Sequence, residues 1–146
     1  MISRPLIVGA KGSIGRRYTA IMREWYCEPL TMDLGDDVPE GFDGVLIATP
    51  TDDHVNRIRQ FLPYGKPILC EKAISKDVGE VELILAEADA AGVQLDMVNQ
   101  YRFCAVDPLP PGDDLTYLNY FNHGKDGLEW DCISILGLAR GKAVLR

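Results

Sequence analysis

The chain has 146 residues, 47% of them hydrophobic, which is enough for one domain with a substantial apolar core. Its formal net charge of −7 argues against nucleic acid or an anionic membrane as a partner, because either surface would repel it. Its longest apolar runs are shorter than the roughly 18 residues of a membrane span, and the N-terminus lacks a signal-peptide pattern, so a cytoplasmic protein is expected.

Strand-like and helix-like segments alternate along the first two thirds of the chain. Five short apolar runs read as buried strands, and they occupy residues 4–10, 28–33, 43–49, 66–71 and 93–101. Most are apolar throughout, as expected for strands that are covered on both faces in a parallel sheet. This alternation predicts an α/β fold, a Rossmann-type doubly wound parallel sheet.

Three helices are predicted between these strands. The first carries an apolar face of Ile14, Tyr18, Ile21, Met22 and Trp25. The second covers residues 51–62, and the third runs from a capping box at Asp77 and Glu80 to Gly92.

The proline-rich segment "DPLPPGDD" at residues 107–114 interrupts this rhythm. We therefore expect a Rossmann-type domain over residues 1–106 and a short strand-helix extension over residues 107–146. Because so short an extension cannot form a core of its own, it should pack on the same domain or on a partner subunit. Its predicted helix at 127–139 is apolar nearly all round, which indicates a homodimer.

The segment "IVGAKGSIGRRY" joins the first strand to the first helix, and its glycines are spaced as GxxGxxG. A chain that turns sharply and approaches a pyrophosphate closely needs residues without a β-carbon, and the amides at the helix start then face the phosphates. The predicted contacts are Gly9, Ala10, Gly12, Ser13, Ile14 and Gly15. Asp33, at the end of the second strand, can bind the adenosine ribose. The plainer interpretation is an ordinary tight turn and a turn aspartate.

Two opposite charges follow the fourth strand in "YGKPILCEKAIS", at Glu71 and Lys72. Such a pair is commonly the point where a strand reaches water, but it can also carry chemistry. The four cysteines, Cys27, Cys70, Cys104 and Cys132, form no CxxC pair, so no metal site or redox pair is predicted.

The stretch "VLIATPTDDHVNRIRQFLPYGKPILCEKAIS" resembles the glucose-fructose oxidoreductase, inositol dehydrogenase and MocA family, written Gfo/Idh/MocA. The resemblance covers roughly residues 4–105, including "VNQYRF" with Arg102 and Phe103. The residues that match the family's motifs are Ala48, Thr49, Pro50, His54, Gly65, Lys66, Glu71 and Lys72.

The resemblance implies a dinucleotide cofactor, NAD with NADP possible, in contact with Ala48, Thr49, Pro50, His54, Glu71 and Lys72. It places Thr49 and Pro50 at the nicotinamide half. It also implies that Lys72 is catalytic and hydrogen-bonds the reacting hydroxyl of a sugar or polyol during hydride transfer. A partly buried ammonium suits this role because it can donate to a developing alkoxide. For His54, a surface position or a supporting hydrogen-bond role is the alternative.

The sequence also departs from the family. Ala73 stands where the family motif has proline, and an alanine would resist a cis peptide bond. In the "DxGxHxxD" helix pattern, Ile135 and Leu138 occupy the positions of the histidine and the second aspartate, and the loop residue His123 is a poor substitute. The chain is also too short for the family's second domain. Weak activity is therefore expected.

Three functions are compatible with these residues. The first is an NAD(P)-dependent oxidoreductase acting on a hydroxyl or carbonyl substrate of the sugar or polyol class. The second is a non-catalytic dinucleotide-binding module with a regulatory or assembly role. The third is a reductase of another Rossmann type, since the glycine turn is also similar to that of dihydrodipicolinate reductases and extended short-chain dehydrogenases, although no tyrosine is followed by the lysine of a YxxxK pair.

Overall fold

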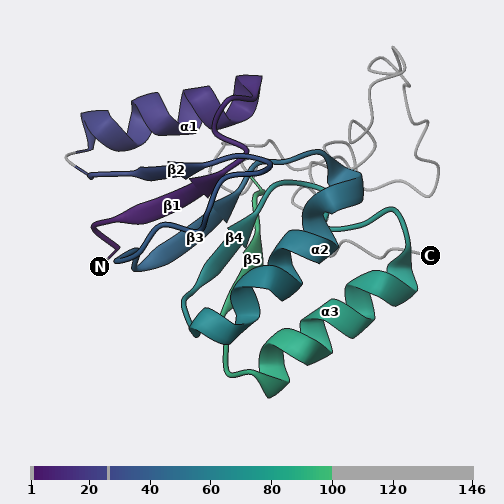
Figure 1. Ribbon diagram of the computed structural model, residues 1–146. Helices are drawn as coiled ribbons and strands as arrows, with labels where there is room; N and C mark the ends of the chain where they lie inside the picture. Colours follow the sequence, from purple (N-terminus) through teal and green to yellow (C-terminus); the bar gives the residue numbers. More distant parts are fainter. Residues whose placement is uncertain (1, 26, 100–146) are drawn as a thin grey trace, which may run out of the picture. The chain divides into compact units, whose positions relative to one another are not determined.

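The computed structural model of the chain describes residues 2–25 and 27–99. Five parallel strands form one sheet in the order β2-β1-β3-β4-β5 (Figure 1). The strands are β1 (Pro5–Val8), β2 (Leu30–Met32), β3 (Gly44–Ile47), β4 (Ile68–Cys70) and β5 (Leu95–Met97). The predicted doubly wound α/β fold is confirmed.

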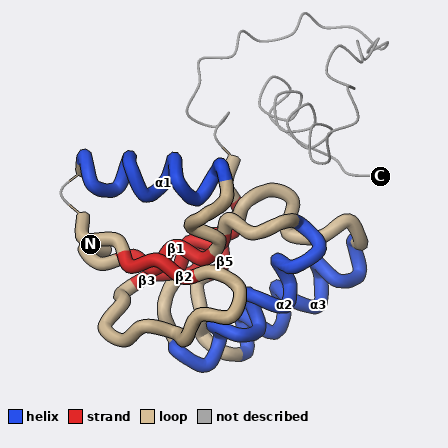
Figure 2. The backbone as a smooth tube through the Cα atoms, turned by 45° about the horizontal axis from the view of Figure 1, so that its top comes forward, coloured by secondary structure: helices blue, strands red, loops and turns tan. Residues whose placement is uncertain are grey.

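The helices lie on both faces of this sheet, as Figures 1 and 2 show. Helix α1 (Ser13–Glu24) covers one face, and helices α2 (Thr51–Phe61) and α3 (Val78–Ala90) cover the other. A short 3₁₀ turn, η1 (Leu62–Tyr64), follows α2. The chain leaves β1 toward β2 and leaves β3 toward β4, so the connections diverge between β1 and β3. In open α/β sheets this switch point leaves a crevice at the carboxyl ends of the strands.

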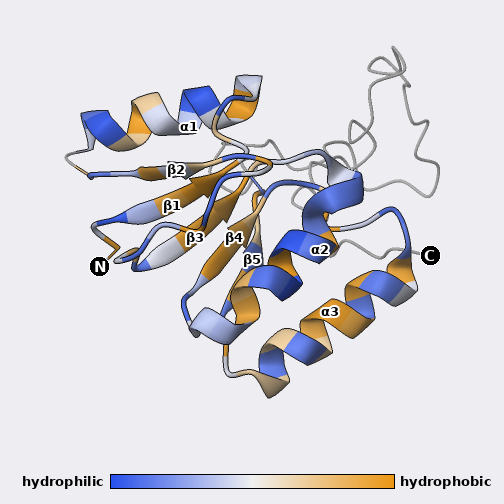
Figure 3. Cartoon of the chain, in the orientation of Figure 1, coloured by the Kyte–Doolittle hydropathy of each residue, from blue (hydrophilic) through white to orange (hydrophobic). Residues whose placement is uncertain are grey.

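The core has two unequal layers. The larger layer lies between the sheet and helices α2 and α3, where alternate strand residues point to one side: Leu6, Val8, Val45, Ile47, Ile68 and Cys70. The smaller layer, under α1, contains Ile7, Ala10 and Leu46, with Tyr18 and Met22 of the helix packed against them. Figure 3 shows the hydrophobic colour concentrated on the strands, while α2 and α3 alternate between hydrophobic and hydrophilic stripes.

Burial of the strands on both faces is confirmed for β1 and β3, in which every residue is buried. It is wrong for β4, where Leu69 is 37% exposed, because this residue points to the side that the single helix α1 covers only in part. It is also wrong for β2, where Thr31 is exposed. Trp25, expected on the buried face of the first helix, is 71% exposed because it stands beyond the last helical residue.

One of the two hydrogen bonds of the predicted capping box of α3 is confirmed. The Asp77 carboxylate accepts a hydrogen bond from the Glu80 amide at 2.9 Å, as predicted. The Glu80 carboxylate, however, accepts from the Ser75 hydroxyl at 2.6 Å, and that same hydroxyl accepts from the Asp77 amide at 3.1 Å. Ser75 therefore mediates the contact that a direct capping box would make.

The extension over residues 107–146 lies outside the described residues, as do Arg102, Phe103, His123, Ile135 and Leu138. The homodimer and the domain boundary at 106 therefore stay predictions. In the ranges 2–25 and 27–99, no helix is long and apolar enough to cross a bilayer.

Candidate functional site

The glycine turn between β1 and α1 is fixed by close contacts between main-chain atoms. Gly9 has a φ of +86°, and a β-carbon there would stand 2.8 Å from the carbonyl oxygen of Ala48. A β-carbon on Gly15 would stand 2.2 Å from the carbonyl oxygen of Gly9. The turn therefore packs against the end of β3 on one side and against the first turn of α1 on the other, and larger residues would push these segments apart.

Helix α1 begins directly after this turn. Gly12 is its N-cap residue and provides no side chain to its first amides, and no acidic residue stands in its first turn. The partial positive charge of the helix start is therefore available to an anion that approaches from the crevice.

A cavity of about 390 Å³ opens at the carboxyl ends of β1 and β3. Six of the predicted cofactor contacts line it, namely Gly9, Gly12, Asp33, Ala48, Thr49 and Pro50. Within the described part of the chain, the Thr49 hydroxyl is buried without a hydrogen-bond partner. Since buried polar groups are nearly always paired, this hydroxyl is a position where a ligand would complete the hydrogen bonding.

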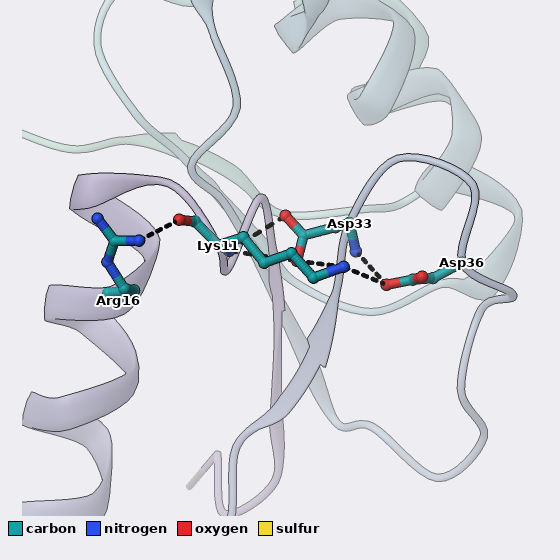
Figure 4. A network of polar contacts seen from close by, with 4 residues as sticks. All are labelled: Lys11, Arg16, Asp33 and Asp36. Atoms are coloured by element: carbon teal, nitrogen blue, oxygen red, sulfur yellow. Dashed lines mark hydrogen bonds and ion pairs between the residues drawn. The ribbon is translucent and has the colours of Figure 1, made fainter.

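Asp33 lies at the rim of this cavity and holds the glycine turn (Figure 4). Its carboxylate oxygens accept hydrogen bonds from the Lys11 amide at 3.1 and 3.2 Å. The Lys11 ammonium stands 3.9 Å from an oxygen of Asp33 and 3.9 Å from an oxygen of Asp36, although its side chain is 78% exposed. The Arg16 guanidinium donates to the Lys11 carbonyl at 2.8 Å. The predicted ribose-binding carboxylate thus lies beside one ammonium, which it shares with Asp36.

Lys11 and Arg16 also line a second cavity of about 490 Å³, which shares Asp33 with the first. It is lined by Ala10, Lys11, Arg16, Thr19, Ala20, Arg23, Thr31, Asp33 and Asp36. Ala10, another predicted contact, therefore lies at this second cavity. Ser13, Ile14 and Gly15 form the start of α1.

Four residues that line the first cavity were not among the predicted contacts: Val8, Leu34, Asp53 and Arg57. Arg57 donates to the Asp53 carboxylate at 2.7 Å and to the Gln60 side chain at 2.9 Å, so its guanidinium is held along α2. The spacing of Asp53 and Arg57, four residues apart on a predicted helix, is the signal that could have identified this pair.

Glu71 and Lys72 follow β4 at the same edge of the sheet. The Glu71 amide donates to the Ile47 carbonyl at 2.9 Å and so extends the pairing between β3 and β4. The Tyr18 hydroxyl of α1 donates to one carboxylate oxygen of Glu71, and the Lys72 amide donates to the other at 3.2 Å. Burial, together with the Glu71 carboxylate, raises the pKa of Tyr18 well above its ordinary value, so its hydroxyl stays protonated.

The peptide bond between Lys72 and Ala73 is cis, although alanine was expected to resist this geometry. Lys72 itself is half-buried.

His54, in the first half of α2, is only 1% exposed. One ring nitrogen, Nδ1, lies 2.6 Å from the carbonyl oxygen of Ala73. The other, Nε2, lies 2.8 Å from the carbonyl oxygen of Thr49. His54 is therefore a buried bridge between two loops of the site.

The family described as "Oxidoreductase family, NAD-binding Rossmann fold", Gfo/Idh/MocA, matches residues 20–99. This range contains Asp33, Thr49, His54 and Lys72, and it begins after the glycine turn.

Several curated relatives are inositol dehydrogenases by name. Inositol 2-dehydrogenase of Rhizobium meliloti (strain 1021) is 39% identical over 66 residues, 45% of this chain and 20% of that protein. The scyllo-inositol 2-dehydrogenase (NADP(+)) IolU of Bacillus subtilis (strain 168) is 39% identical over 54 residues, 37% of this chain and 16% of that protein. The matched part of the chain thus spans a fifth or less of the length of either relative.

Solved structures share the fold. The WlbA (WbpB) dehydrogenase from Thermus thermophilus, in complex with NAD and alpha-ketoglutarate, superposes with a TM-score of 0.59 at 22% identity, over 71% of this chain and 43% of that one. The myo-inositol 2-dehydrogenase from Lactobacillus plantarum gives a TM-score of 0.55 at 18% identity, over 73% of this chain and 39% of that one. By its fold and by the sequence match over residues 20–99, the chain belongs to the Gfo/Idh/MocA oxidoreductase family with the NAD-binding Rossmann fold.

Proposed function

We propose that the chain binds NAD and carries the cofactor and lysine half of an oxidoreductase site that transfers hydride between nicotinamide and a hydroxyl or carbonyl substrate. The observation that supports this proposal is that three features lie together at the carboxyl ends of the strands: the glycine turn, Asp33 and the segment that bears Lys72. The 390 Å³ cavity begins at the glycine turn and reaches the Thr49 end of β3, beside which β4 delivers Glu71 and Lys72.

The residues of this edge fit a dinucleotide. Gly9 and Gly12 allow a pyrophosphate to approach the start of α1, and Asp33 can accept hydrogen bonds from ribose hydroxyls. The unpaired hydroxyl of Thr49 can bond the nicotinamide half. We place NAD ahead of NADP, because a 2′-phosphate would meet the charge of Asp33.

A bound nicotinamide supplies the hydride chemistry, and Lys72 acts on the substrate oxygen. In the direction of reduction, the ammonium of Lys72 donates a hydrogen bond to the carbonyl oxygen and then a proton, as that oxygen gains charge. In the reverse direction the amine of Lys72 accepts the proton of the hydroxyl. Both steps require Lys72 to be held in a defined place.

The substrate class proposed is a sugar or polyol. Two of the relatives that the chain is similar to are named inositol 2-dehydrogenase, and inositol is a polyol. Turnover is expected to be low, because Ile135 stands where the family motif has its histidine.

That same departure supports a second candidate function, a dinucleotide-binding module without catalysis. In this case NADH binds at the glycine turn, and Lys72 only ends a strand.

One experiment tests both. NADH binding by the full chain is followed by fluorescence, and oxidation of a panel of sugars and polyols is then measured for the wild type and for Lys72→Met. Methionine keeps most of the stem volume but removes the proton donor, so kcat should fall about a hundredfold, which corresponds to about 2.7 kcal/mol, while the Kd for NADH stays the same.

A ratio of mutant to wild-type kcat near one rejects the catalytic role of Lys72. Binding of NADH without turnover of any substrate on the panel supports the non-catalytic module. Absence of NADH binding contradicts both functions.

A further inference from the structure

The two residues on either side of Lys72 are each held by a side chain from a different helix, partly buried in the case of Tyr18 and fully buried in the case of His54. Tyr18 of α1 reaches Glu71 from one face of the sheet, and His54 of α2 reaches Ala73 from the other. These contacts join parts of the chain that are far apart in sequence, and they converge on the residue to which the proposed function assigns the chemistry.

On the α1 side, the Tyr18 ring packs against the small apolar layer of Ile7, Ala10 and Leu46. Its hydroxyl donates to one oxygen of the Glu71 carboxylate, whose other oxygen accepts from the Lys72 amide at 3.2 Å. Tyr18 and the Lys72 backbone therefore share one carboxylate. A phenylalanine would fill the same space, so what the hydroxyl adds is this hydrogen bond.

On the α2 side, both ring nitrogens of His54 face carbonyl oxygens, of Ala73 at 2.6 Å and of Thr49 at 2.8 Å. A carbonyl only accepts hydrogen bonds, so a neutral ring donates to one of the two and a protonated ring to both. The ring thereby links the loop that follows Lys72 to the loop that lines the cavity at the end of β3.

We propose that Tyr18 and His54 are positioning residues, which hold the backbone on both sides of Lys72 and fix it relative to the cavity at Thr49. This inference rests on the proposed function and deepens it, because it assigns the placement of Lys72 to two side chains outside the reaction itself. A displacement of a reacting group by about 1 Å can cost about a hundredfold in rate.

Tyr18→Phe is the first test, because it removes one hydroxyl and keeps the ring in the core. We expect kcat to fall about tenfold while the Kd for NADH changes by less than about twofold. Tyr64→Phe is the matched control. Tyr64 packs against Phe42 and Phe61 after α2, at the opposite edge of the sheet, and its loss should leave kcat unchanged.

A double-mutant cycle separates positioning from a general structural role. If Tyr18 acts through Lys72, adding Tyr18→Phe to Lys72→Met should change kcat by less than about twofold. If the same tenfold fall occurs in both backgrounds, or if Tyr18→Phe alone has no effect on kcat, the inference is overturned.

His54→Gln and His54→Leu test the other side. Glutamine keeps an N–H donor that can bond one carbonyl, and leucine keeps none. The expected order of kcat is therefore wild type, then glutamine, then leucine. Equal values for the wild type and the glutamine and leucine variants would exclude a role for the ring nitrogens. The leucine variant leaves the two carbonyls without a hydrogen-bond donor and can therefore unfold. If the leucine variant is unfolded, the comparison of the wild type with His54→Gln decides the test.

A readout that needs no substrate keeps this inference distinct from the proposed function. Hydrogen–deuterium exchange of the segment over residues 71–75 should be faster in Tyr18→Phe and in His54→Gln than in the wild type and in Tyr64→Phe. Unchanged exchange in both variants overturns the inference. If the wild-type chain fails to bind NADH or to turn over any substrate, the proposed function fails, and the exchange measurement still decides whether the two side chains hold this loop.

Discussion

The glycine turn over residues 9–15 and the lysine loop over residues 71–75 lie at the same edge of the sheet but are built in opposite ways. The tightest contacts of the turn are between backbone atoms, and an added β-carbon at Gly15 would come within 2.2 Å of a carbonyl oxygen. One side chain, the carboxylate of Asp33, also accepts hydrogen bonds from the Lys11 amide at its rim. The loop is held by side chains of Tyr18 and His54 that arrive from two helices. The turn should therefore fail when an atom is added, and the loop when a single polar group is removed.

The largest effect is expected when an atom is added to the turn. Gly15→Ala places its β-carbon against the Gly9 carbonyl and must push α1 away from β1. We expect the free energy of unfolding to fall by about 3 kcal/mol, as for severe overpacking, and NADH binding to be lost. Urea denaturation and a fluorescence titration with NADH check the two effects.

Gly92→Ala is the matched control. Gly92 ends α3 with a φ of +65°, and a β-carbon there would meet no atom within 4 Å. Its replacement should lower the free energy of unfolding by only about 1 kcal/mol, because alanine disfavours the left-handed conformation, and should leave NADH binding intact. If the two variants lose equal stability and both bind NADH, close backbone packing does not define the turn.

An effect of intermediate size is expected at Asp33, whose charge should determine the relative affinities for NADH and NADPH. Asp33 should disfavour a 2′-phosphate by about 1–2 kcal/mol, so the wild type should bind NADH about ten- to thirtyfold more tightly than NADPH. Asp33→Asn should reduce this ratio. Lys11→Met, which removes the ammonium 3.9 Å from Asp33, should increase it. Calorimetric titrations of both cofactors provide the ratios, and equal affinities in the wild type would show that the cations around Asp33 dominate.

The smallest effect is expected far from the site, at the amino end of β3. Burial raises the pKa of Asp43, but hydrogen bonds from Ser3 and Arg4 outweigh it and hold that pKa below its ordinary value. Asp43 therefore stabilises the fold fully above the unfolded pKa of about 3.9, and this stabilisation is lost as the pH falls through the folded pKa.

Asp43→Asn should accordingly lower the melting temperature by at most about 4 °C near neutral pH, with no change in NADH binding. The difference between wild type and variant should disappear in melts recorded at about pH 2. A loss of NADH binding in this variant would mean that hydrogen bonds far from the site also influence it. Effects at the turn and at the loop could then not be assigned to their own contacts.

The turn could be predicted from the sequence because its requirements are local. A buried strand, glycines at fixed spacing and an amphipathic helix follow one another, so Gly9, Gly12 and Gly15 were identified by order alone. Asp33 was predicted in the same way, from its place at the end of the next strand, and it lines the first cavity. The five strands were likewise found from short apolar runs.

The loop could not be predicted to the same depth because its partners are set by the tertiary fold. Tyr18 was expected only on an apolar helix face, and nothing in the sequence links its hydroxyl to Glu71. His54 was predicted as a cofactor contact from the family resemblance, and nothing in the sequence shows that its ring lies between two carbonyls. The exposure of Leu69 has the same origin, since the sequence does not reveal how much of a sheet face one helix covers.

The most direct test of the central claim is to map NADH onto the chain by amide NMR. At saturation, shifts are predicted at residues 9–15, at Asp33 and Leu34, and at Thr49, the segments that form the first cavity and the start of α1. The region around Asp43 at the opposite edge of the sheet should be unaffected. Shifts confined to residues outside the glycine turn and Thr49, or no shifts at saturating NADH, would contradict a dinucleotide site at this edge.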